Sequence, residues 1–172
     1  MYIRVNITRE KQSIDKLVDE LIKNTDPSTG AVSVFVGFDK GLIDNRNVYK
    51  LIYDAYEPYA SKSLENIARE EAEKHGLKGV IIIHRIGELV PGEPTIYIVA
   101  AAKSRHEAFT GIRDILERVK HESYIYKLEI RDDGEYWVLG DGKRIKRLRR
   151  QISSKLIRRP EAGLSDSLRP SP

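Results

Sequence analysis

At residues 84–93 the chain reads HRIGELVPGE, and an apolar run, Val80–Ile83, stands directly before it. A short apolar run of this kind is typical of a buried strand, and the pair Pro91-Gly92 marks a turn. The stretch therefore predicts a buried strand that ends in a turn. Because strand–turn units occur in many folds, the fold class depends on the patterns on either side.

Those patterns predict a mixture of helices and strands. Helices are expected with apolar faces at 14–22, 64–72 and 108–119. Strands are expected at 1–5, 31–37, 47–56, 80–84, 95–102, 124–130 and 135–139, with a loop at 38–46. Ser104 and Glu107 form a capping box at the start of the third helix. Because helices and strands do not alternate strictly, the order favours an α+β fold over a doubly wound sheet.

The composition is that of one globular domain with a charged surface. The 172 residues are 40% hydrophobic and 33% charged, and there is no cysteine. Disulfides and thiolate nucleophiles are therefore excluded, so any sulfur chemistry must use sulfur that a partner brings. No apolar run approaches the roughly 18 residues of a membrane helix, and the start does not read as a secretory signal. We expect a cytoplasmic protein.

Positive charge gathers near the C-terminus. The net charge is +4, and residues 143–159 contain nine Lys and Arg residues without an acidic residue. Apolar residues at 145, 148, 152 and 156 predict a basic amphipathic helix there. We therefore divide the chain into a main domain at 1–142, a basic C-terminal helix or extension at 143–159, and a tail at 160–172. The tail is rich in Pro and Ser, which predicts disorder.

Six short motifs follow one another between Gly30 and Trp137. They are GAVSVFVG at 30–37, YDAYEPYA at 53–60, HRIGELVPGE at 84–93, SRHEAF at 104–109, the pair Lys120 and Lys127 with Glu129, and the hairpin Gly134 to Trp137. Each motif is weak alone, but the ordered set covers most of the chain. Together they resemble the MoaE family, the large catalytic subunits of molybdopterin synthase.

The resemblance implies a fold, a reaction and partners. The fold would be an alpha/beta-hammerhead-like domain with a small antiparallel β subdomain. The reaction would convert cyclic pyranopterin monophosphate, a pterin, into molybdopterin by installing a dithiolene. Both sulfurs would come from the C-terminal thiocarboxylate of a small ubiquitin-like subunit. The large subunit would form a homodimer that binds two small subunits, giving a heterotetramer. No metal or organic cofactor is expected in the protein itself.

The resemblance gives the catalytic roles to Lys120 and Lys127. The substrate phosphate and the thiocarboxylate are anionic, so a pocket for both must be cationic. Lys120 ends the best-defined helix and Lys127 lies on the strand that follows. If that strand folds back, the two amines converge, and they could then transfer protons, attack the acyl group or stabilise an oxyanion. From spacing alone, both would be solvated surface lysines.

Four further residues are predicted to bind substrate. Ser104, Arg105 and His106 fall at the start of a helix, where free N–H groups and the helix dipole favour a phosphate. Arg105 would add a bidentate clamp. The alternative is that Ser104 only caps the helix and Arg105 is solvated. Lys40 stands where the family has a loop arginine. His84 is more often a core residue than a catalyst, and we assign it no role.

Departures from the family pattern keep other functions open. Ser104 replaces the family's histidine, Lys40 replaces its arginine, and Tyr124 and Tyr126 replace a Pro and a Trp. A non-catalytic scaffold or binding paralogue of the same fold is therefore the second hypothesis. Nucleic-acid binding through the basic segment is the third. It is disfavoured because aromatic residues that could stack on bases are not interleaved in that segment.

Overall fold

The computed structural model describes residues 1–140 and 142–148 of the chain. Its helices are α1 (Ile14–Lys23), α2 (Tyr59–His75) and α3 (Arg105–Glu122). Its strands are β1 (Tyr2–Thr8), β2 (Ala31–Phe38), β3 (Leu42–Ile43), β4 (Arg46–Ala55), β5 (Gly79–Arg85), β6 (Gly87–Leu89), β7 (Pro94–Ala102), β8 (Ile125–Arg131), β9 (Gly134–Val138) and β10 (Arg144–Lys146).

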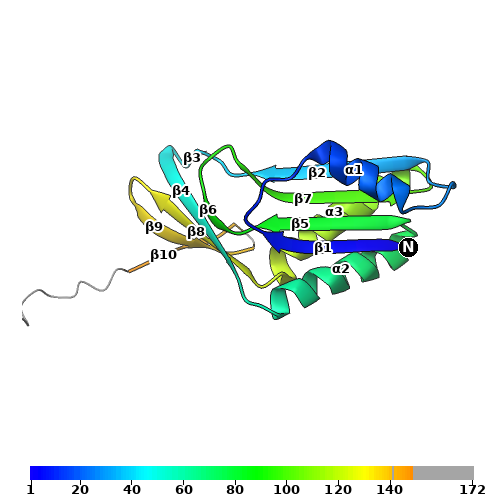
Figure 1. The fold of residues 1–172 in the computed structure, drawn as a ribbon. Helices are drawn as coiled ribbons and strands as arrows, with labels where there is room; N and C mark the ends of the chain where they lie inside the picture. Colours follow the sequence, from blue (N-terminus) through cyan, green and yellow to red (C-terminus); the bar gives the residue numbers. More distant parts are fainter. Residues whose placement is uncertain (141, 149–172) are drawn as a thin grey trace, which may run out of the picture.

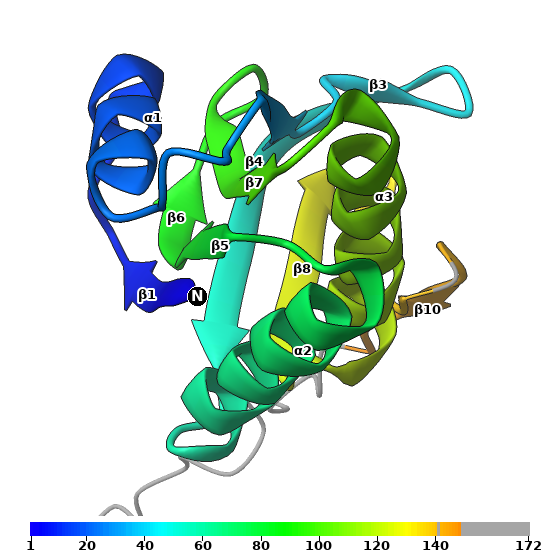
Figure 2. The same ribbon diagram turned by 90° about the vertical axis from the view of Figure 1, so that its right-hand side faces the viewer.

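The first sheet forms the centre of a three-layer sandwich. Its strand order is β1-β5-β7-β2, with β1 parallel to β5 and the other pairs antiparallel. Helices α2 and α3 cover one face of this sheet and α1 covers the other (Figures 1 and 2). Strand β5 therefore has helices on both sides.

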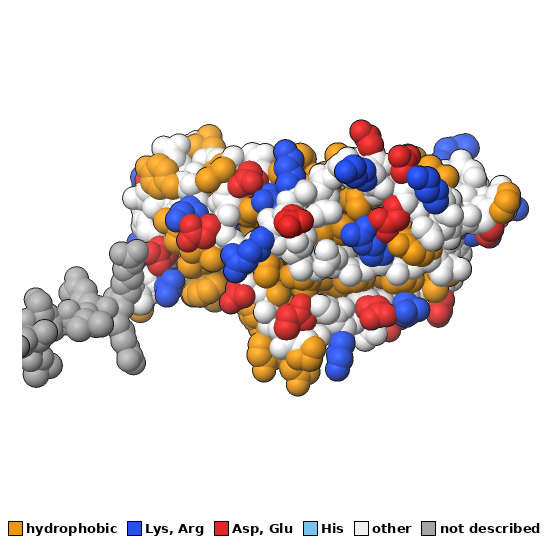
Figure 3. All heavy atoms as spheres, in the orientation of Figure 1, with side chains coloured by type: hydrophobic (Ala, Val, Ile, Leu, Met, Phe, Trp, Pro, Cys, Tyr) orange, Lys and Arg blue, Asp and Glu red, His pale blue; other side chains and the backbone are white. Residues whose placement is uncertain are grey.

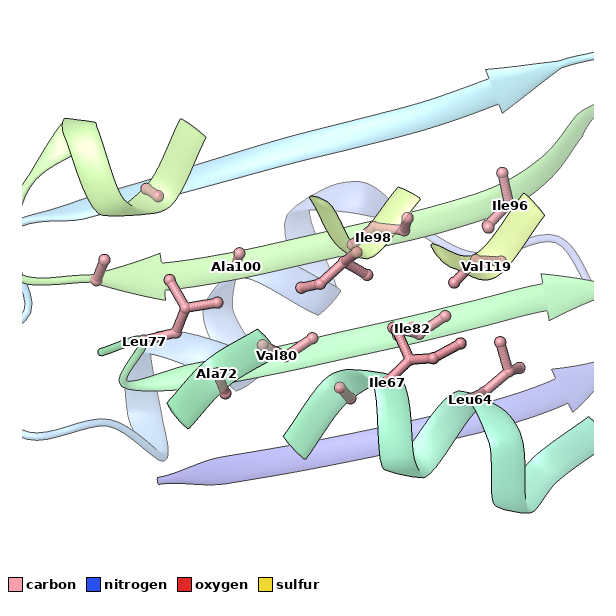
Figure 4. Close-up of a cluster of buried hydrophobic side chains, with 14 residues drawn as sticks. Leu64, Ile67, Ala72, Leu77, Val80, Ile82, Ile96, Ile98, Ala100 and Val119 are labelled. Carbon is pink, nitrogen blue, oxygen red and sulfur yellow. The ribbon is translucent and has the colours of Figure 1, made fainter. Parts of the chain in front are cut away.

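This arrangement explains the uninterrupted apolar run in β5. Successive side chains of a strand point to opposite faces. Val80 and Ile82 lie in the core under α2 and α3 (Figure 4), and Ile81 and Ile83 pack against α1. All four are fully buried. A strand covered on both faces has no polar side to alternate with its apolar side.

The second sheet lies at one end of the sandwich (Figure 1). Its order is β10-β9-β8-β4-β3, with β6 also paired to β4, and its neighbours are antiparallel. The predicted α+β class with a small antiparallel subdomain is confirmed. The prediction did not resolve β3, which lies within the expected loop, or β6, which lies within the expected turn.

The predicted basic helix is wrong at its beginning. Residues 144–146 form strand β10, which pairs antiparallel with β9. The reason is the carboxylate of Glu129, which is fully buried on β8 and binds the Arg144 guanidinium through two hydrogen bonds of 2.8 and 3.2 Å. A buried carboxylate needs such a partner. The extended backbone of β10 places the Arg144 guanidinium beside it. The rest of the predicted helix from 149 on, and the tail at 160–172, lie outside the described residues.

The surface is charged but mixed. On the face shown in Figure 3, acidic and basic side chains are interspersed over the sheet and α1. No helix in the described part of the chain is long and apolar enough to cross a membrane.

The turn after β9 approaches the end of α3 closely. A Cβ atom added at Gly140 would lie 2.2 Å from the Lys120 carbonyl oxygen and 3.0 Å from His121 Nδ1. We therefore expect Gly140→Ala to lower the free energy of unfolding by about 1–3 kcal/mol, because the hairpin must move away from the helix. Denaturant titration of the purified variant measures this change.

A matched control is Gly41→Ala. The added Cβ would meet only two ring carbons of Pro91, at 3.3 and 3.9 Å, and no backbone atom, so a smaller change is expected. Equal stability of the two variants would show that the hairpin is not held against α3.

Candidate active site

A cavity of about 650 Å³ opens where the two sheets meet. The end of β2, strands β4, β5 and β8, the last turns of α3 and the β9–β10 hairpin contribute its walls. Apolar side chains such as Phe35, Val119 and Ile125 alternate there with charged ones. The site is thus formed at the junction of the sandwich and the antiparallel subdomain.

The structure brings Lys120 and Lys127 to this one cavity. Lys120 lies in the last turn of α3, is about half exposed, and its Nζ is 3.3 Å from Glu117 Oε1. Lys127 lies on β8 and is more enclosed, with its side chain 25% exposed. The fold-back of the strand after α3 is therefore as expected, while the catalytic role of the two lysines stays a prediction.

Two buried carboxylates surround the Lys127 amine. Its Nζ donates to Asp39 Oδ1 at 2.9 Å and lies 3.7 Å from Glu129 Oε1. Glu129 also binds Arg144, which lines the same cavity. The charged residues that line this part of the cavity are therefore of both signs, with Lys127 and Arg144 beside Asp39 and Glu129.

Tyr53 completes this network from the neighbouring strand. Tyr53 on β4 stands opposite Lys127 on β8, and its hydroxyl donates to Asp39 Oδ1 at 2.7 Å. The Lys127 amine lies 5.7 Å from the centre of the Tyr53 ring. Burial and the Asp39 carboxylate hold the pKa of Tyr53 far above its usual range. Tyr53 is therefore a hydrogen-bond donor and not an acid at physiological pH.

His84 lies beside Tyr53 in the wall of the cavity. The two ring centres are 5.4 Å apart, and His84 Nδ1 is 2.8 Å from the carbonyl oxygen of Arg85. Burial lowers the pKa of His84 to about 4, so the imidazole is neutral. The Arg85 carbonyl can only accept, which places the proton on Nδ1.

Lys40 joins the same cavity, whereas the other predicted substrate-binding residues do not. Lys40 lines the cavity and is exposed. Ser104, Arg105 and His106 lie at the start of α3, and Lys120 lies near its end. Fifteen residues of helix separate Arg105 from Lys120, about 22 Å at 1.5 Å per residue. One copy of the chain therefore does not bring Arg105 to the lysines.

The start of α3 already holds a carboxylate. The Ser104 hydroxyl accepts a hydrogen bond from the His106 N–H at 3.4 Å and binds the Glu107 carboxylate. The bond from Ser104 lowers the pKa of Glu107. The predicted capping box is confirmed. Glu107 competes with any phosphate for this position, while the Arg105 side chain is exposed and available.

Asp39 and Arg144 are the charged residues of the cavity that the sequence motifs missed. Tyr53 and Glu129 stood within quoted motifs without an assigned role, but Asp39 belonged to none. The available signal was a carboxylate directly after the apolar strand that ends at Gly37 and Phe38.

A second cavity, of about 740 Å³, adjoins the first. It is lined by Tyr59, Tyr124 and Tyr126, and both cavities share Lys120 and Ile125. The ring of Tyr59 stacks on that of Tyr56 and is tilted against that of Tyr124. Lys120 therefore stands at the junction of a charged cavity and an aromatic one.

One cluster away from these cavities has metal-ligating residue types. Glu71, His75 and Asp114 meet between α2 and α3. The Lys74 amine binds Glu71 Oε2 at 3.0 Å and Asp114 Oδ2 at 3.1 Å. A cation of the chain itself thus already balances these carboxylates.

The comparisons with known proteins agree on one family. The family model described as MoaE protein matches residues 7–122. The molybdopterin synthase catalytic subunit of Pyrococcus abyssi is 41% identical over 114 residues, which are 66% of this chain and 77% of that protein. The protein of the same name from Emericella nidulans is 42% identical over 108 residues, which are 63% of this chain and 55% of that protein.

Solved structures share the fold. The MoaE protein of Burkholderia ambifaria superposes with a TM-score of 0.68 at 28% identity, covering 80% of this chain and 89% of that one. Molybdopterin synthase from Staphylococcus aureus gives a TM-score of 0.68 at 30% identity, covering 76% of this chain and 93% of that one.

The buried His84 predicts a pH dependence of stability. Its pKa is about 4 in the folded chain and about 6.5 when unfolded, so between these values the unfolded chain binds more protons. Stability is then lost as the pH falls from 6.5 to 4, by about 3 kcal/mol from this residue. Denaturant titrations across this range should show a steeper loss for the wild type than for His84→Asn, whose amide can still donate to Arg85. Parallel profiles would contradict a neutral buried imidazole.

Proposed function

The chain belongs to the MoaE protein family, and from this premise we propose that it is a molybdopterin synthase catalytic subunit. It would transfer sulfur from the thiocarboxylated C-terminus of a small ubiquitin-like subunit to cyclic pyranopterin monophosphate. The matched region spans most of the Pyrococcus abyssi protein but only about half of the E. nidulans protein. The single observation that carries the proposal is the meeting of Lys120 and Lys127 in one cavity.

The cavity supplies what this sulfur transfer requires. In each transfer the thiocarboxylate sulfur bonds to a carbon of the substrate, which gives a thioester. Water then adds to the acyl carbon through a tetrahedral oxyanion, and the acyl C–S bond breaks to leave a carboxylate on the tail and the sulfur on the substrate. An ammonium group held in a partly dry cavity stabilises such an oxyanion more than water does. Lys127, fixed by carboxylates, supports this role. Lys120 is more exposed and weakly paired, which leaves its amine free to contact a ligand.

Two adjoining cavities suit a reaction with two anionic reactants. The substrate phosphate would lie among Lys40, Lys120 and Lys127 in the charged cavity. The extended tail of the small subunit would reach Lys120 through the aromatic cavity. The two reactants would then meet at the shared lysine, so that neither blocks the entry of the other.

The proposed assembly is a homodimer that binds two small subunits. Arg105 lies about 22 Å along α3 from Lys120 in the same chain. A second copy could place its own Arg105 beside the lysines of the first, and the dimer then provides the phosphate clamp. The cytoplasmic location stays a prediction from the composition.

The contacts of the basic segment disfavour nucleic-acid binding. Arg144 donates to the buried Glu129 carboxylate, and Arg147 Nη1 lies 3.4 Å from Glu135 Oε2. The Lys146 amine binds the carbonyl oxygen of Asp133 at 3.1 Å. These basic groups stabilise the hairpin. The scaffold hypothesis remains, and product formation separates it from the enzyme.

The decisive test mixes the purified chain with its thiocarboxylated small subunit and cyclic pyranopterin monophosphate, and quantifies molybdopterin. We expect product with the wild type, and a rate at least about 100-fold lower with Lys120→Ala or Lys127→Ala, because each removes a cation from the reacting centre. The control is Lys23→Ala, an exposed lysine on α1. Absence of product with the wild type would favour the scaffold, and full activity of both lysine variants would refute their assignment.

Mixing two inactive variants tests whether Arg105 acts across the dimer. Arg105→Ala and Lys127→Ala should each lose activity alone. Subunit exchange in an equal mixture should restore about a quarter of the wild-type rate, since half the dimers are mixed and each mixed dimer keeps one intact site. A mixture no more active than the sum of its components would place Arg105 outside the partner's site.

A further inference from the structure

Asp39 is fixed in place by the turn that follows β6. Its backbone N–H donates to the carbonyl oxygen of Glu93 at 3.5 Å, and its own carbonyl oxygen accepts from the Gly92 N–H at 3.0 Å. The register of β2 against β7 shifts directly before it, between Gly37 and Phe38. A register shift re-aims the side chains that follow it. The Asp39 side chain thereby lines the cavity from the edge of the first sheet.

The carboxylate of Asp39 is only partly satisfied by the described residues. Its side chain is 2% exposed. Oδ1 accepts hydrogen bonds from the Tyr53 hydroxyl and the Lys127 amine. Oδ2 is buried and has no hydrogen-bond partner within the described part of the chain. A buried carboxylate oxygen without a partner is costly, so stability alone does not account for an acid at this position.

Asp39 makes the shortest carboxylate contact of Lys127 within the described residues. The distance to Asp39 Oδ1 is 2.9 Å, whereas Glu129 Oε1 lies at 3.7 Å, beyond hydrogen-bond length. The two oxygens of Glu129 instead accept hydrogen bonds from the Arg144 guanidinium. Without Asp39, the flexible Lys127 side chain would lose the contact that selects one position for its amine.

We propose that Asp39 is the positioning residue of Lys127. It holds the amine at the inner end of the cavity, and Tyr53 in turn holds the Asp39 carboxylate. The role of this contact between Asp39 and Lys127 rests on the proposed sulfur transfer, in which the Lys127 amine must stabilise a developing oxyanion at a fixed place. A donor fixed before the reaction stabilises that charge without reorganisation, whereas a mobile amine must first be ordered.

The first test measures, without any turnover, how strongly Lys127 is held, through the reactivity of its amine. N-hydroxysuccinimide acetate acetylates amines, and mass spectrometry of the digested full-length chain gives the rate at each lysine. Asp39→Asn keeps the size of the side chain but removes its charge, and charged hydrogen bonds are roughly twice as strong as neutral ones. We expect the Lys127 rate to rise several-fold in Asp39→Asn and further in Asp39→Ala, with Lys120 unchanged as internal reference.

The matched control is Asp44→Asn, which removes an exposed carboxylate from the turn between β3 and β4. Its Lys127 rate should equal that of the wild type. Circular dichroism checks that each variant is folded, and if Asp39→Ala does not fold, the isosteric Asp39→Asn decides. An unchanged Lys127 rate in folded Asp39→Asn overturns the proposal.

The second test uses the assembled synthase. Asp39→Ala should lower kcat by about 10–100-fold with little change in KM for the pterin, because Asp39 acts through a group that stabilises the transition state. Asp39→Asn should recover part of this loss, since it keeps an acceptor oxygen. A rise in KM alone, with kcat intact, overturns the positioning role.

The two arms separate this inference from the proposed function. If the wild type forms no molybdopterin, the sulfur-transfer proposal fails, while the acetylation rates still show whether Asp39 holds Lys127. If the wild type forms product and Asp39→Asn changes neither Lys127 reactivity nor kcat, only the positioning role fails.

Discussion

The fully buried Glu129 carboxylate is the constraint on which the functional end of the molecule depends. A charge removed from water must be matched by opposite charges and hydrogen bonds. Arg144 supplies two hydrogen bonds from β10, and Lys127 approaches from the same strand as Glu129. The requirement therefore ties β10 to β8 across β9, and Glu129 and Lys127 meet the cavity from the same strand.

Periodicity and motifs predicted the framework because burial controls it. The apolar run of β5 and the capping of α3 are local signals, and both elements formed where they were expected. The shared cavity of Lys120 and Lys127 was expected from the family resemblance and from a strand that folds back. What local signals could not provide was pairing between distant segments. Arg144 was predicted to be helical because its partner Glu129 is fifteen residues away and its burial is not visible in the sequence.

Asp39 illustrates the same limit at the site. In the sequence it is one acid in a loop, next to an exposed phenylalanine and an exposed lysine. Its burial arises because the turn at Gly92 and Glu93 binds its backbone from a segment more than fifty residues later. The stretch at residues 84–93 thus contributes to the cavity through backbone hydrogen bonds, which side-chain motifs do not report.

The contact between Asp39 and Lys127 also joins the two sheets. Asp39 directly follows β2 of the first sheet and Lys127 belongs to β8 of the second. A reactant that binds the Lys127 amine competes with Asp39 for it. By thermodynamic linkage, the free energy of binding that reactant is then coupled to the free energy of the contact between the two sheets. The ion pair of Asp39 and Lys127 therefore ties the sandwich to the antiparallel subdomain beside the cavity that we propose as the site of sulfur transfer.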